Sequence, residues 1–340
     1  MKVAKLYSFN DIRIEDMPVP GVGPGDALIK TRACGICSGD VMPWYIEKKA
    51  PLVPGHEPAG VIVEIGSGVS SFKKGDRVFT HHHAPCFKCR FCRRGDYVQC
   101  ETWKNSRIIP GGVSEYILVP AVNLENDTIL LPGEMDFEDA ALIEPVACVL
   151  KGLKRACIRR GDTVLVMGLG VMGMINIMAA KHFGAGRVIG ADMVRFRLNK
   201  AVELGADEVI DVSKGGLCDV LTEFTKGEMA ELVIVGPNSA DAMMQGLTCV
   251  RPGGQVLFFT PAKPGERLSV DPNFLYFNDI NIITSYSCGP SDTADACEII
   301  GRGIISAAKI VTDRFPLEGT SEAFRLTAAA GNSLKAMIVF

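Results

Sequence analysis

The sequence predicts an α/β protein in which a doubly wound parallel sheet is inserted into a mostly antiparallel β domain. From about Asp162 to about Ser287, short β-rich runs alternate with helical patterns, which is typical of a parallel sheet covered by helices. The stretch before Asp162 has short strands separated by proline and glycine turns and almost no long helix, which favours antiparallel pairing. The length of 340 residues is sufficient for two domains.

The parallel sheet is expected to consist of strands that alternate with helices. The predicted strands are TVLVMG, RVIGAD, EVIDV, ELVIVG and GQVLFFT, and the predicted helices are VMGMINIMAAKHFG, FRLNKAVELG, LCDVLTEFTK and one around Ala242. In the first part of the chain, GVIVEIG and DRVFT are predicted strands. The tail after about Gly289 has a helical stretch and the strand AMIVF, too little to fold alone. We therefore expect one domain at residues 1–148 and 289–340, and an inserted domain at residues 149–288.

Composition excludes several classes of function. The formal net charge is -3, with Lys+Arg 36 and Asp+Glu 39, so the chain lacks the basic surface that binds a nucleic-acid backbone. The uncharged stretch from Thr163 to Ala180 is not expected to span a membrane, because it contains spaced glycines and charged residues bound it tightly. Charges scattered through the N-terminal segment argue against a secretory signal. We expect a cytoplasmic protein with no nucleic-acid or membrane partner.

The clearest metal-binding pattern is CFKCRFCRRGDYVQC. Its cysteines, Cys86, Cys89, Cys92 and Cys100, have the spacing CxxCxxCx7C. Four thiolates close a tetrahedron around zinc and leave no open position, which is the arrangement of a structural site. An iron–sulfur cluster also takes four thiolates, and the spacing alone does not exclude it. Zinc is favoured over such a cluster. In a reducing compartment, the 12 cysteines of the chain indicate metal ligation plus ordinary buried thiols rather than a disulfide framework.

A glycine-rich loop predicts a dinucleotide site. GLGVMG, with Gly168, Gly170 and Gly173, directly follows a predicted strand and opens a predicted helix. These glycines permit a tight turn, a close approach of the backbone to a pyrophosphate, and contact between helix and strand. In this context the motif favours a nicotinamide cofactor.

The choice between NAD and NADP depends on the end of the next strand. Asp192, 24 positions after Gly168, is placed to accept both ribose hydroxyls of NAD and to repel the 2′-phosphate of NADP. The same residue also fits a structural role as a helix cap. Arg197 is a second candidate for cofactor contact, although it equally fits the solvated face of its helix. NAD is the expected cofactor.

Three distant segments together suggest a second metal site. ACGICSGD contains Cys37, PGHEPAG contains His56 and Glu57, and LIEPVAC contains Glu144. A thiolate, an imidazole and a carboxylate bind zinc and leave one position open for catalysis. Taken singly, such residues are more often ordinary core or surface residues. The run HHH, at His81 to His83, could also suggest a metal site. We instead expect one of these histidines to line a pocket.

The chain resembles the zinc-dependent medium-chain dehydrogenases, and specifically their sorbitol dehydrogenase branch. CGICSGD, GHEPAG, the four-cysteine segment, GGVSEY, IEPVAC, GDTVLVMGLGVMG, RPGGQVLFF and SLKAMIVF occur in the order of that family. The resemblance implies that residues 1–148 and 289–340 form a GroES-like catalytic domain and residues 149–288 a Rossmann NAD-binding domain. It also implies two zinc ions per chain, one catalytic and one structural, and a homodimer or homotetramer that assembles through edge strands of the Rossmann domains near Asp279 to Ser285.

The resemblance further assigns roles to single residues. Cys37, His56 and Glu144 match the catalytic zinc positions, Glu57 matches a glutamate that ligates zinc directly, and Asp40 matches a residue that orients the histidine. Lys335 matches a basic position that meets the cofactor pyrophosphate, and Met172 one that packs behind the nicotinamide. The remaining cysteines, Cys34, Cys148, Cys157, Cys218, Cys249, Cys288 and Cys297, are expected to be ordinary buried thiols.

One departure concerns proton transfer. The family usually has a serine or threonine two residues after the zinc cysteine and a histidine three residues further on, whereas this chain has Gly39 and Met42. Ser38 lies one place early, and a shift of one residue redirects a side chain, so the relay role is not assigned to it.

The expected function is NAD-linked oxidation of a secondary alcohol in a small-molecule polyol, polyol phosphate, vicinal diol or amino alcohol to a ketone. The alternative is an NAD(H)-binding module without turnover, used for redox sensing or as a structural unit, which the missing relay residues favour. The retained set of Cys37, His56, Glu57 and Glu144 argues against that alternative.

Overall fold

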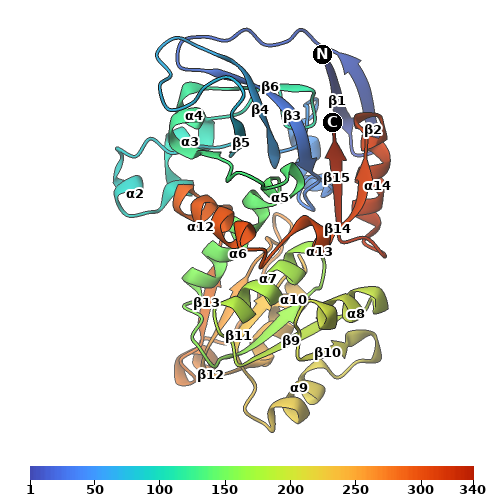
Figure 1. The fold of residues 1–340 in the computed structure, drawn as a ribbon. Helices are drawn as coiled ribbons and strands as arrows, with labels where there is room; N and C mark the ends of the chain where they lie inside the picture. The colour runs from blue at the N-terminus through green and yellow to red at the C-terminus, as the bar shows by residue number, and fades with distance from the viewer. The chain divides into compact units, whose positions relative to one another are not determined.

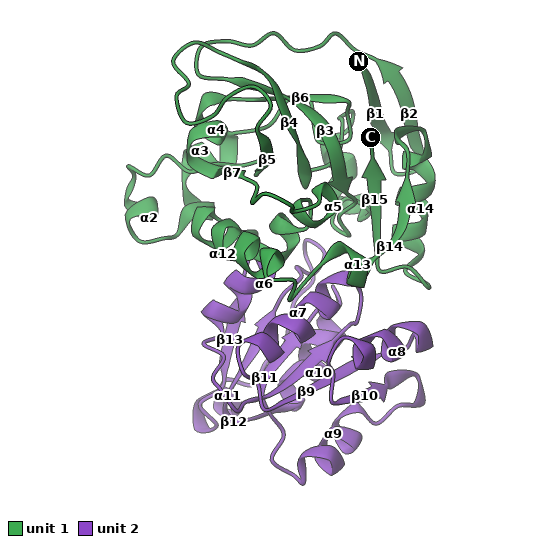
Figure 2. Ribbon diagram, viewed as in Figure 1, with its two compact units in different colours: residues 1–147, 287–340 green, residues 148–286 purple.

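The computed structural model describes residues 1–340 and divides into two compact units. Unit 1 comprises residues 1–147 and 287–340, and unit 2 comprises residues 148–286 (Figure 2). The chain thus leaves unit 1 once and returns to it.

Unit 2 contains a six-stranded parallel sheet in the order β10-β9-β8-β11-β12-β13. Its strands are β8 (Thr163–Met167), β9 (Arg187–Asp192), β10 (Glu208–Asp211), β11 (Ala230–Val235), β12 (Val250–Phe258) and β13 (Asn281–Thr284). Between them lie α7 (Val171–His182), α8 (Arg195–Glu203), η3 (Val212–Lys214), α9 (Leu217–Thr225), α10 (Ala240–Thr248) and α11 (Pro272–Phe277) (Figure 1). The strand order reverses between β8 and β11, and at such a switch point open α/β sheets bind ligands.

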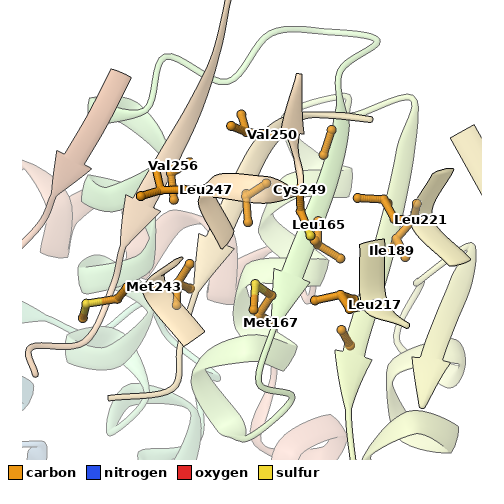
Figure 3. Close-up of a cluster of buried hydrophobic side chains, with 14 of the residues drawn as sticks. Leu165, Met167, Ile189, Leu217, Leu221, Met243, Leu247, Cys249, Val250 and Val256 are labelled. Atoms are coloured by element: carbon orange, nitrogen blue, oxygen red, sulfur yellow. The ribbon is translucent and has the colours of Figure 1, made fainter. Parts of the chain in front are cut away.

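The core of unit 2 explains its strand sequences. Strands buried on both faces read as nearly continuous apolar runs, as TVLVM and AELVIV do. Figure 3 shows Leu165, Met167 and Ile189 from neighbouring strands in one cluster with side chains of α9 and α10. The cluster contains Leu217, Leu221, Met243, Leu247 and Cys249, among others. The helices are therefore held on the sheet mainly by burial of apolar surface.

Unit 1 is built on mostly antiparallel strands. One sheet has the order β14-β15-β3-β4-β5-β7, with β6 also paired to β3, and β1 pairs with β2 in a separate ribbon. The strands are β1 (Lys2–Ser8), β2 (Asp11–Asp16), β3 (Ala27–Gly35), β4 (Pro58–Ile65), β5 (Arg77–Thr80), β6 (Tyr116–Val119), β7 (Thr128–Leu130), β14 (Val311–Phe315) and β15 (Lys335–Val339). Only β14 and β15 pair in parallel in that sheet. The tail strand β15 enters it beside β3.

Short helices connect these strands. They are α1 (Pro43–Ile46), η1 (Glu47–Lys49), α2 (Arg90–Arg93), η2 (Tyr97–Gln99), α3 (Glu101–Asn105), α4 (Ala121–Asp127), α5 (Phe137–Ala140), α12 (Pro290–Gly301), α13 (Ala307–Ile310), η4 (Leu317–Gly319) and α14 (Thr320–Ala329). None of the helices in the structure combines the length and the apolar character that crossing a bilayer requires.

The observed architecture confirms the predicted fold class, an antiparallel β domain plus a doubly wound parallel sheet. The longest helix that was not predicted is α6 (Ile143–Arg155), which runs from unit 1 into unit 2. Pro145 lies in the first turn of α6, where the backbone N–H of a helix has no partner within the helix, so the proline does not interrupt it. Glu144 therefore projects from the beginning of a helix.

Candidate metal and nucleotide sites

The four-cysteine segment folds into one compact cluster of thiols. Cys100 Sγ lies 3.6 Å from Cys86 Sγ, and Cys92 Sγ lies 4.0 Å from Cys86 Sγ and 3.5 Å from Cys89 Sγ. The backbone N–H of Lys88 donates to Cys86 Sγ, and this hydrogen bond is the main reason that the pKa of Cys86 is lowered to about 6. The fold thus favours the thiolate form at one corner of the cluster.

These distances fit a single zinc ion. A tetrahedron with metal–sulfur bonds of about 2.3 Å has edges of about 3.8 Å, and the three sulfur–sulfur distances lie on both sides of that value. A multinuclear iron–sulfur cluster places several iron and sulfide atoms between the thiolates and needs a wider cavity. Cys86, Cys89, Cys92 and Cys100 can therefore hold a closed, structural zinc.

The second group consists of Cys37, His56 and Glu57, whose ligand atoms lie within 4.8 Å of one another. The pairing of two strands explains why these three residues lie close together. Cys37 follows β3, His56 and Glu57 precede β4, and these strands run antiparallel with Cys34 opposite Pro58. The residues just after one strand and just before the other must therefore converge.

Neighbouring groups orient these ligands. Asp40 Oδ2 lies 3.4 Å from His56 Nδ1, which leaves Nε2 of the same ring for a metal, the usual arrangement of a metal-binding histidine. Burial lowers the pKa of His56, but the charges of Asp40 and Cys37 outweigh it and raise that pKa well above its ordinary value. The backbone N–H of Gly39 donates to Cys37 Sγ at 3.3 Å. A thiolate, an oriented imidazole and a carboxylate form a donor set that suits zinc.

Glu57 has a second partner that the sequence pattern did not suggest. Lys335 Nζ lies 2.8 Å from Glu57 Oε1 and 2.5 Å from Oε2, and it also donates to the Ile36 carbonyl oxygen at 3.0 Å. The side chains are 1% and 0% exposed. Gly35 makes room for the pair, because a Cβ there would lie 1.9 Å from Glu57 Oε2. The ammonium of Lys335 is thus directed at Glu57, and its contact with a cofactor pyrophosphate stays a prediction.

Glu144 belongs to a neighbouring group with His81 and His82, in which the ligand atoms again lie within 4.8 Å of one another. His81 Nδ1 lies 2.7 Å from Asp127 Oδ2, and His81 Nε2 lies 3.7 Å from Cys288 Sγ. Sequence reasoning did not connect these residues with Glu144. The histidine run after strand β5 was the signal, but nothing in the sequence told which ring would face the glutamate.

His82 links the two groups. Its ring centroid lies 5.0 Å from that of His56, and its Nδ1 is buried without a hydrogen-bond partner. Burial, together with the neighbouring His81 and His83, lowers the pKa of His82 well below its ordinary value. The ring is therefore neutral near pH 7 and offers one polar atom that the protein does not use.

The structure shows what surrounds the positions at which the family's proton-relay residues are missing. Ser38 is exposed, which agrees with leaving the relay role unassigned to it. A Cβ at Gly39 would contact only Cys37 Sγ, at 3.5 Å, so the glycine leaves open space beside the metal ligand.

In unit 2, the glycine-rich loop connects β8 to α7. Gly168 has φ +82°, a conformation that favours glycine. A Cβ at Gly173 would lie 2.1 Å from the Gly168 carbonyl oxygen, whereas a Cβ at Gly170 would meet open space. Gly170 is the N-cap of α7, and Met172 lies in its first turn, partly buried. The loop thus presents the beginning of a 12-residue helix for a phosphate group.

Asp192 ends β9 beside this loop. Its Oδ2 accepts the Leu169 N–H at 2.7 Å and its Oδ1 accepts the Val194 N–H at 2.8 Å. Each carboxylate oxygen keeps a further lone pair, so the residue is positioned by the fold and still able to bind ribose hydroxyls. Arg197 lies 3.8 Å from Asp192, is 15% exposed, and has a buried Nε without a hydrogen-bond partner. It is therefore not on a solvated helix face, and its unused donor fits a cofactor.

The remaining thiols differ from the expectation in three places, one of which is Cys148, which is only partly buried within α6. Cys157 is exposed, although the sequence predicted that it is buried; it lies just after α6, in a turn where its φ is +47°. Cys218 is only partly buried and contacts Cys249. For Cys157 and Cys218 the prediction was wrong because helix ends and turns, which the pattern located only roughly, decide their exposure.

Two protein-family profiles match the chain: "Alcohol dehydrogenase GroES-like domain" over residues 23–127 and "Zinc-binding dehydrogenase" over residues 171–302. Among curated relatives, the sorbitol dehydrogenase of Bombyx mori is 32% identical, and the alignment covers 98% of this chain and 97% of that protein. The erythritol/L-threitol dehydrogenase of Mycolicibacterium smegmatis is 29% identical, with 100% and 97% covered.

Solved structures agree with these relatives. An alcohol dehydrogenase from Escherichia coli CFT073, complexed with NADH, superposes with a TM-score of 0.90 at 26% identity, covering 100% of this chain and 99% of that one. A zinc-binding dehydrogenase from Sinorhizobium meliloti 1021, bound to NADP, gives a TM-score of 0.89 at 27% identity with the same coverage. With the two metal-ligand groups and the glycine-rich loop, these similarities establish that the chain belongs to the zinc-dependent medium-chain dehydrogenases, in the branch of the sorbitol dehydrogenases.

Proposed function

We propose that this enzyme oxidises a secondary alcohol of a polyol to a ketone, with NAD as the hydride acceptor and two zinc ions per chain. The observation that carries the proposal is the buried group of Cys37, His56 and Glu57 next to Glu144 and His82. A closed four-thiolate site elsewhere in the same unit accounts for the structural zinc, so this second donor set is free for catalysis.

Zinc bound by Cys37, His56 and a glutamate would act as a Lewis acid that lowers the pKa of the substrate hydroxyl, and the nicotinamide would take the hydride. The residues around the ligands prepare that chemistry. Asp40 fixes the orientation of His56, and the Gly39 N–H donates a hydrogen bond to Cys37 Sγ. Glu57 and Glu144 are alternative carboxylate ligands, and the ion pair with Lys335 favours Glu144, because it already satisfies Glu57.

We further assign His82 to substrate binding. Its neutral ring leaves Nδ1 as a hydrogen-bond acceptor inside the site, and a hydroxyl next to the reacting carbon would satisfy that atom. This favours substrates with vicinal hydroxyl groups. The sorbitol and erythritol/L-threitol dehydrogenases among the relatives act on polyols of this kind. Replacing His82 by phenylalanine should raise KM for a polyol far more than KM for a simple secondary alcohol.

NAD is favoured over NADP by Asp192, whose carboxylate is held in place by two backbone N–H groups. A 2′-phosphate near this carboxylate would be repelled. One of the two solved relatives with a bound cofactor contains NADH and the other contains NADP, so the comparison alone does not decide the preference. The ratio of kcat/KM for NAD and NADP tests it directly, and a ratio below one would overturn this assignment.

The decisive experiment combines activity with metal analysis. NADH formation is followed with polyols, polyol phosphates, vicinal diols and threonine, using wild type, Cys37→Ser and, as a matched control, Cys157→Ser. We expect turnover with a polyol, about two zinc ions per chain in wild type and about one in Cys37→Ser, and an unaffected control. Activity retained in Cys37→Ser would refute the catalytic zinc assignment. About one zinc per chain in an inactive wild type would support the alternative, a nucleotide-binding module.

The edge of the parallel sheet is a candidate surface for assembly. We propose a homodimer or homotetramer formed through strand β13, the edge of the parallel sheet. Aromatic side chains next to this edge are exposed, Tyr276 by 77% and Phe277 by 74%, and exposed apolar patches of this kind mark interfaces. We also propose that the enzyme works in the cytoplasm, where reduced thiols remain available for zinc. Sedimentation of wild type and Tyr276→Lys tests the interface; an unchanged mass in the variant would contradict it.

A further inference from the structure

Two cysteines of unit 2 that have no part in the zinc or cofactor sites lie in direct contact. Cys218 Sγ lies 2.7 Å from Cys249 Sγ. Cys218 is in the first turn of α9, and Cys249 is the C-cap of α10. The residues are 31 positions apart in the sequence, so neither spacing nor local structure forces them together.

The hydrophobic core holds this contact in place. Cys249 is fully buried in the same cluster as Leu217 and Leu221 of α9 (Figure 3). Leu217 directly precedes Cys218, so packing of α9 against the sheet fixes where the Cys218 side chain can lie. Cys218 itself is partly exposed, and Thr248 Oγ1 lies 3.1 Å from its sulfur. One sulfur of the pair is therefore accessible and the other is shielded.

The two thiols also differ in acidity. The hydrogen bond with the Cys249 thiol, together with that from Thr248, lowers the pKa of Cys218 to about 6. The same hydrogen bond and burial raise the pKa of Cys249. Since the thiolate is the reactive form of cysteine, Cys218 is the nucleophile of the pair, and Cys249 is a thiol held next to it.

We propose that Cys218 and Cys249 form a peroxide-sensitive dithiol site, in which Cys218 is oxidised first and Cys249 then closes a reversible disulfide. In the first step the Cys218 thiolate attacks one oxygen of hydrogen peroxide. A sulfur–oxygen bond forms, the oxygen–oxygen bond breaks, and the departing hydroxide takes up a proton to become water. The sulfur is oxidised by two electrons and the peroxide is reduced.

In the second step the Cys249 sulfur attacks the Cys218 sulfenic acid. A sulfur–sulfur bond forms, the sulfur–oxygen bond breaks, and the hydroxyl leaves as a second water with the Cys249 proton. A disulfide bond is about 2.0 Å long, so the two sulfurs need only a small approach from their present 2.7 Å. A dithiol reductant such as dithiothreitol reverses the reaction by thiol–disulfide exchange and is itself oxidised.

Peptide mapping tests the site on the zinc-loaded full-length chain. Trypsin separates the two cysteines into residues 215–226 and 227–267, because it cleaves after Lys214, Lys226 and Arg267 but not before Pro252 or Pro264. The protein is treated with stoichiometric hydrogen peroxide, alkylated, digested and analysed by mass spectrometry, with and without dithiothreitol. Cys157, an exposed cysteine, is the internal control for accessible thiols.

We expect the two peptides to appear linked, two hydrogen atoms lighter than their sum, at peroxide concentrations that leave Cys157 free, and to separate after reduction. In Cys249→Ser the Cys218 sulfenic acid should persist and be trapped by dimedone, while Cys218→Ser should give no adduct at Cys249. The proposal is overturned if both cysteines are alkylated as fully as Cys157 after treatment. It is equally overturned if Cys249→Ser gives no more dimedone adduct at Cys218 than wild type gives at Cys157.

Discussion

Removal of one partner from the buried ion pair between Glu57 and Lys335 should destabilise unit 1 strongly. The charged atoms lie 2.5 Å apart and the side chains are 0% and 1% exposed. Two unit charges at that distance attract by roughly 7 kcal/mol when the effective dielectric constant is about 20. This attraction offsets a desolvation cost of several kcal/mol for each ion. The pair is therefore near balance as a whole, but each half alone is costly.

The single and double variants of Glu57 and Lys335 should differ in stability. Lys335→Met leaves a buried carboxylate without its cation and should lower the free energy of unfolding by about 3–5 kcal/mol. Glu57→Gln leaves a buried ammonium and should cost a similar amount. The double variant removes both charges, so it should cost clearly less than the sum of the single variants.

Tryptophan fluorescence during urea unfolding is the appropriate assay. Both tryptophans, Trp44 and Trp103, belong to unit 1, so their signal reports on the unit that contains the pair. Lys5→Met is the matched control, because Lys5 forms a partly exposed ion pair with Glu15 at 3.3 Å, and such pairs contribute about 1 kcal/mol or less. Zinc content is measured for each variant, since Glu57 is also a candidate ligand.

Two outcomes would refute the reasoning. A cost of Lys335→Met no larger than that of Lys5→Met would mean that the lysine is neutral or hydrated in solution. A cost of the double variant equal to the full sum of the single variants would mean that the two charges do not interact.

Three further predictions concern other parts of the chain. Burial raises the pKa of Asp207, but hydrogen bonds from Lys181 and a backbone N–H outweigh burial and lower that pKa overall. The stabilising effect of the Asp207 carboxylate is therefore complete above about pH 3.9 and is lost as the pH falls through the lower folded-state pKa. Asp207→Asn should thus be less stable than wild type at pH 7 by about 1 kcal/mol or less, and urea midpoints that fail to converge in acid would contradict this. Gly173→Ala should lower the free energy of unfolding of the cofactor-free enzyme by about 1–3 kcal/mol, whereas Gly170→Ala, which meets open space, should not; equal circular-dichroism melting curves would disprove the difference. Cys100→Ser should lose the structural zinc, so atomic absorption should give about one ion per chain, and a value of about two would remove this cysteine from the ligand set.

The features that could be predicted from the sequence are those that a short segment encodes by itself. Short turns and helices bring the sulfurs of Cys86, Cys89, Cys92 and Cys100 together, with three sulfur–sulfur distances of 3.5–4.0 Å. The glycine-rich loop is equally local, because its steric requirements lie within six residues. Alternating strand and helix patterns predicted the parallel sheet, because each strand and each helix is also encoded by a short segment. For these elements, the conformation depends mainly on neighbours in the chain.

The candidate catalytic group was only partly predictable. Cys37, His56 and Glu57 were identified, and antiparallel pairing of β3 with β4 brings them together. Glu144 was identified as well, but its position depends on helix α6, which the sequence pattern concealed. His82 and Cys288 were not assigned to the site, because the direction of a side chain after a strand depends on the register of that strand with its neighbours.

The sequence by itself therefore determined the family, the two kinds of domain, the cluster of four cysteines and the glycine-rich loop. Only the tertiary structure decided that Lys335 neutralises Glu57 from 278 positions away and that Cys218 touches Cys249. The physical reason is that each of these contacts joins elements whose relative placement depends on strand register and on the packing of the whole core. The residue type gives the chemical group of a side chain, but the tertiary structure decides which partner changes the pKa or the reactivity of that group.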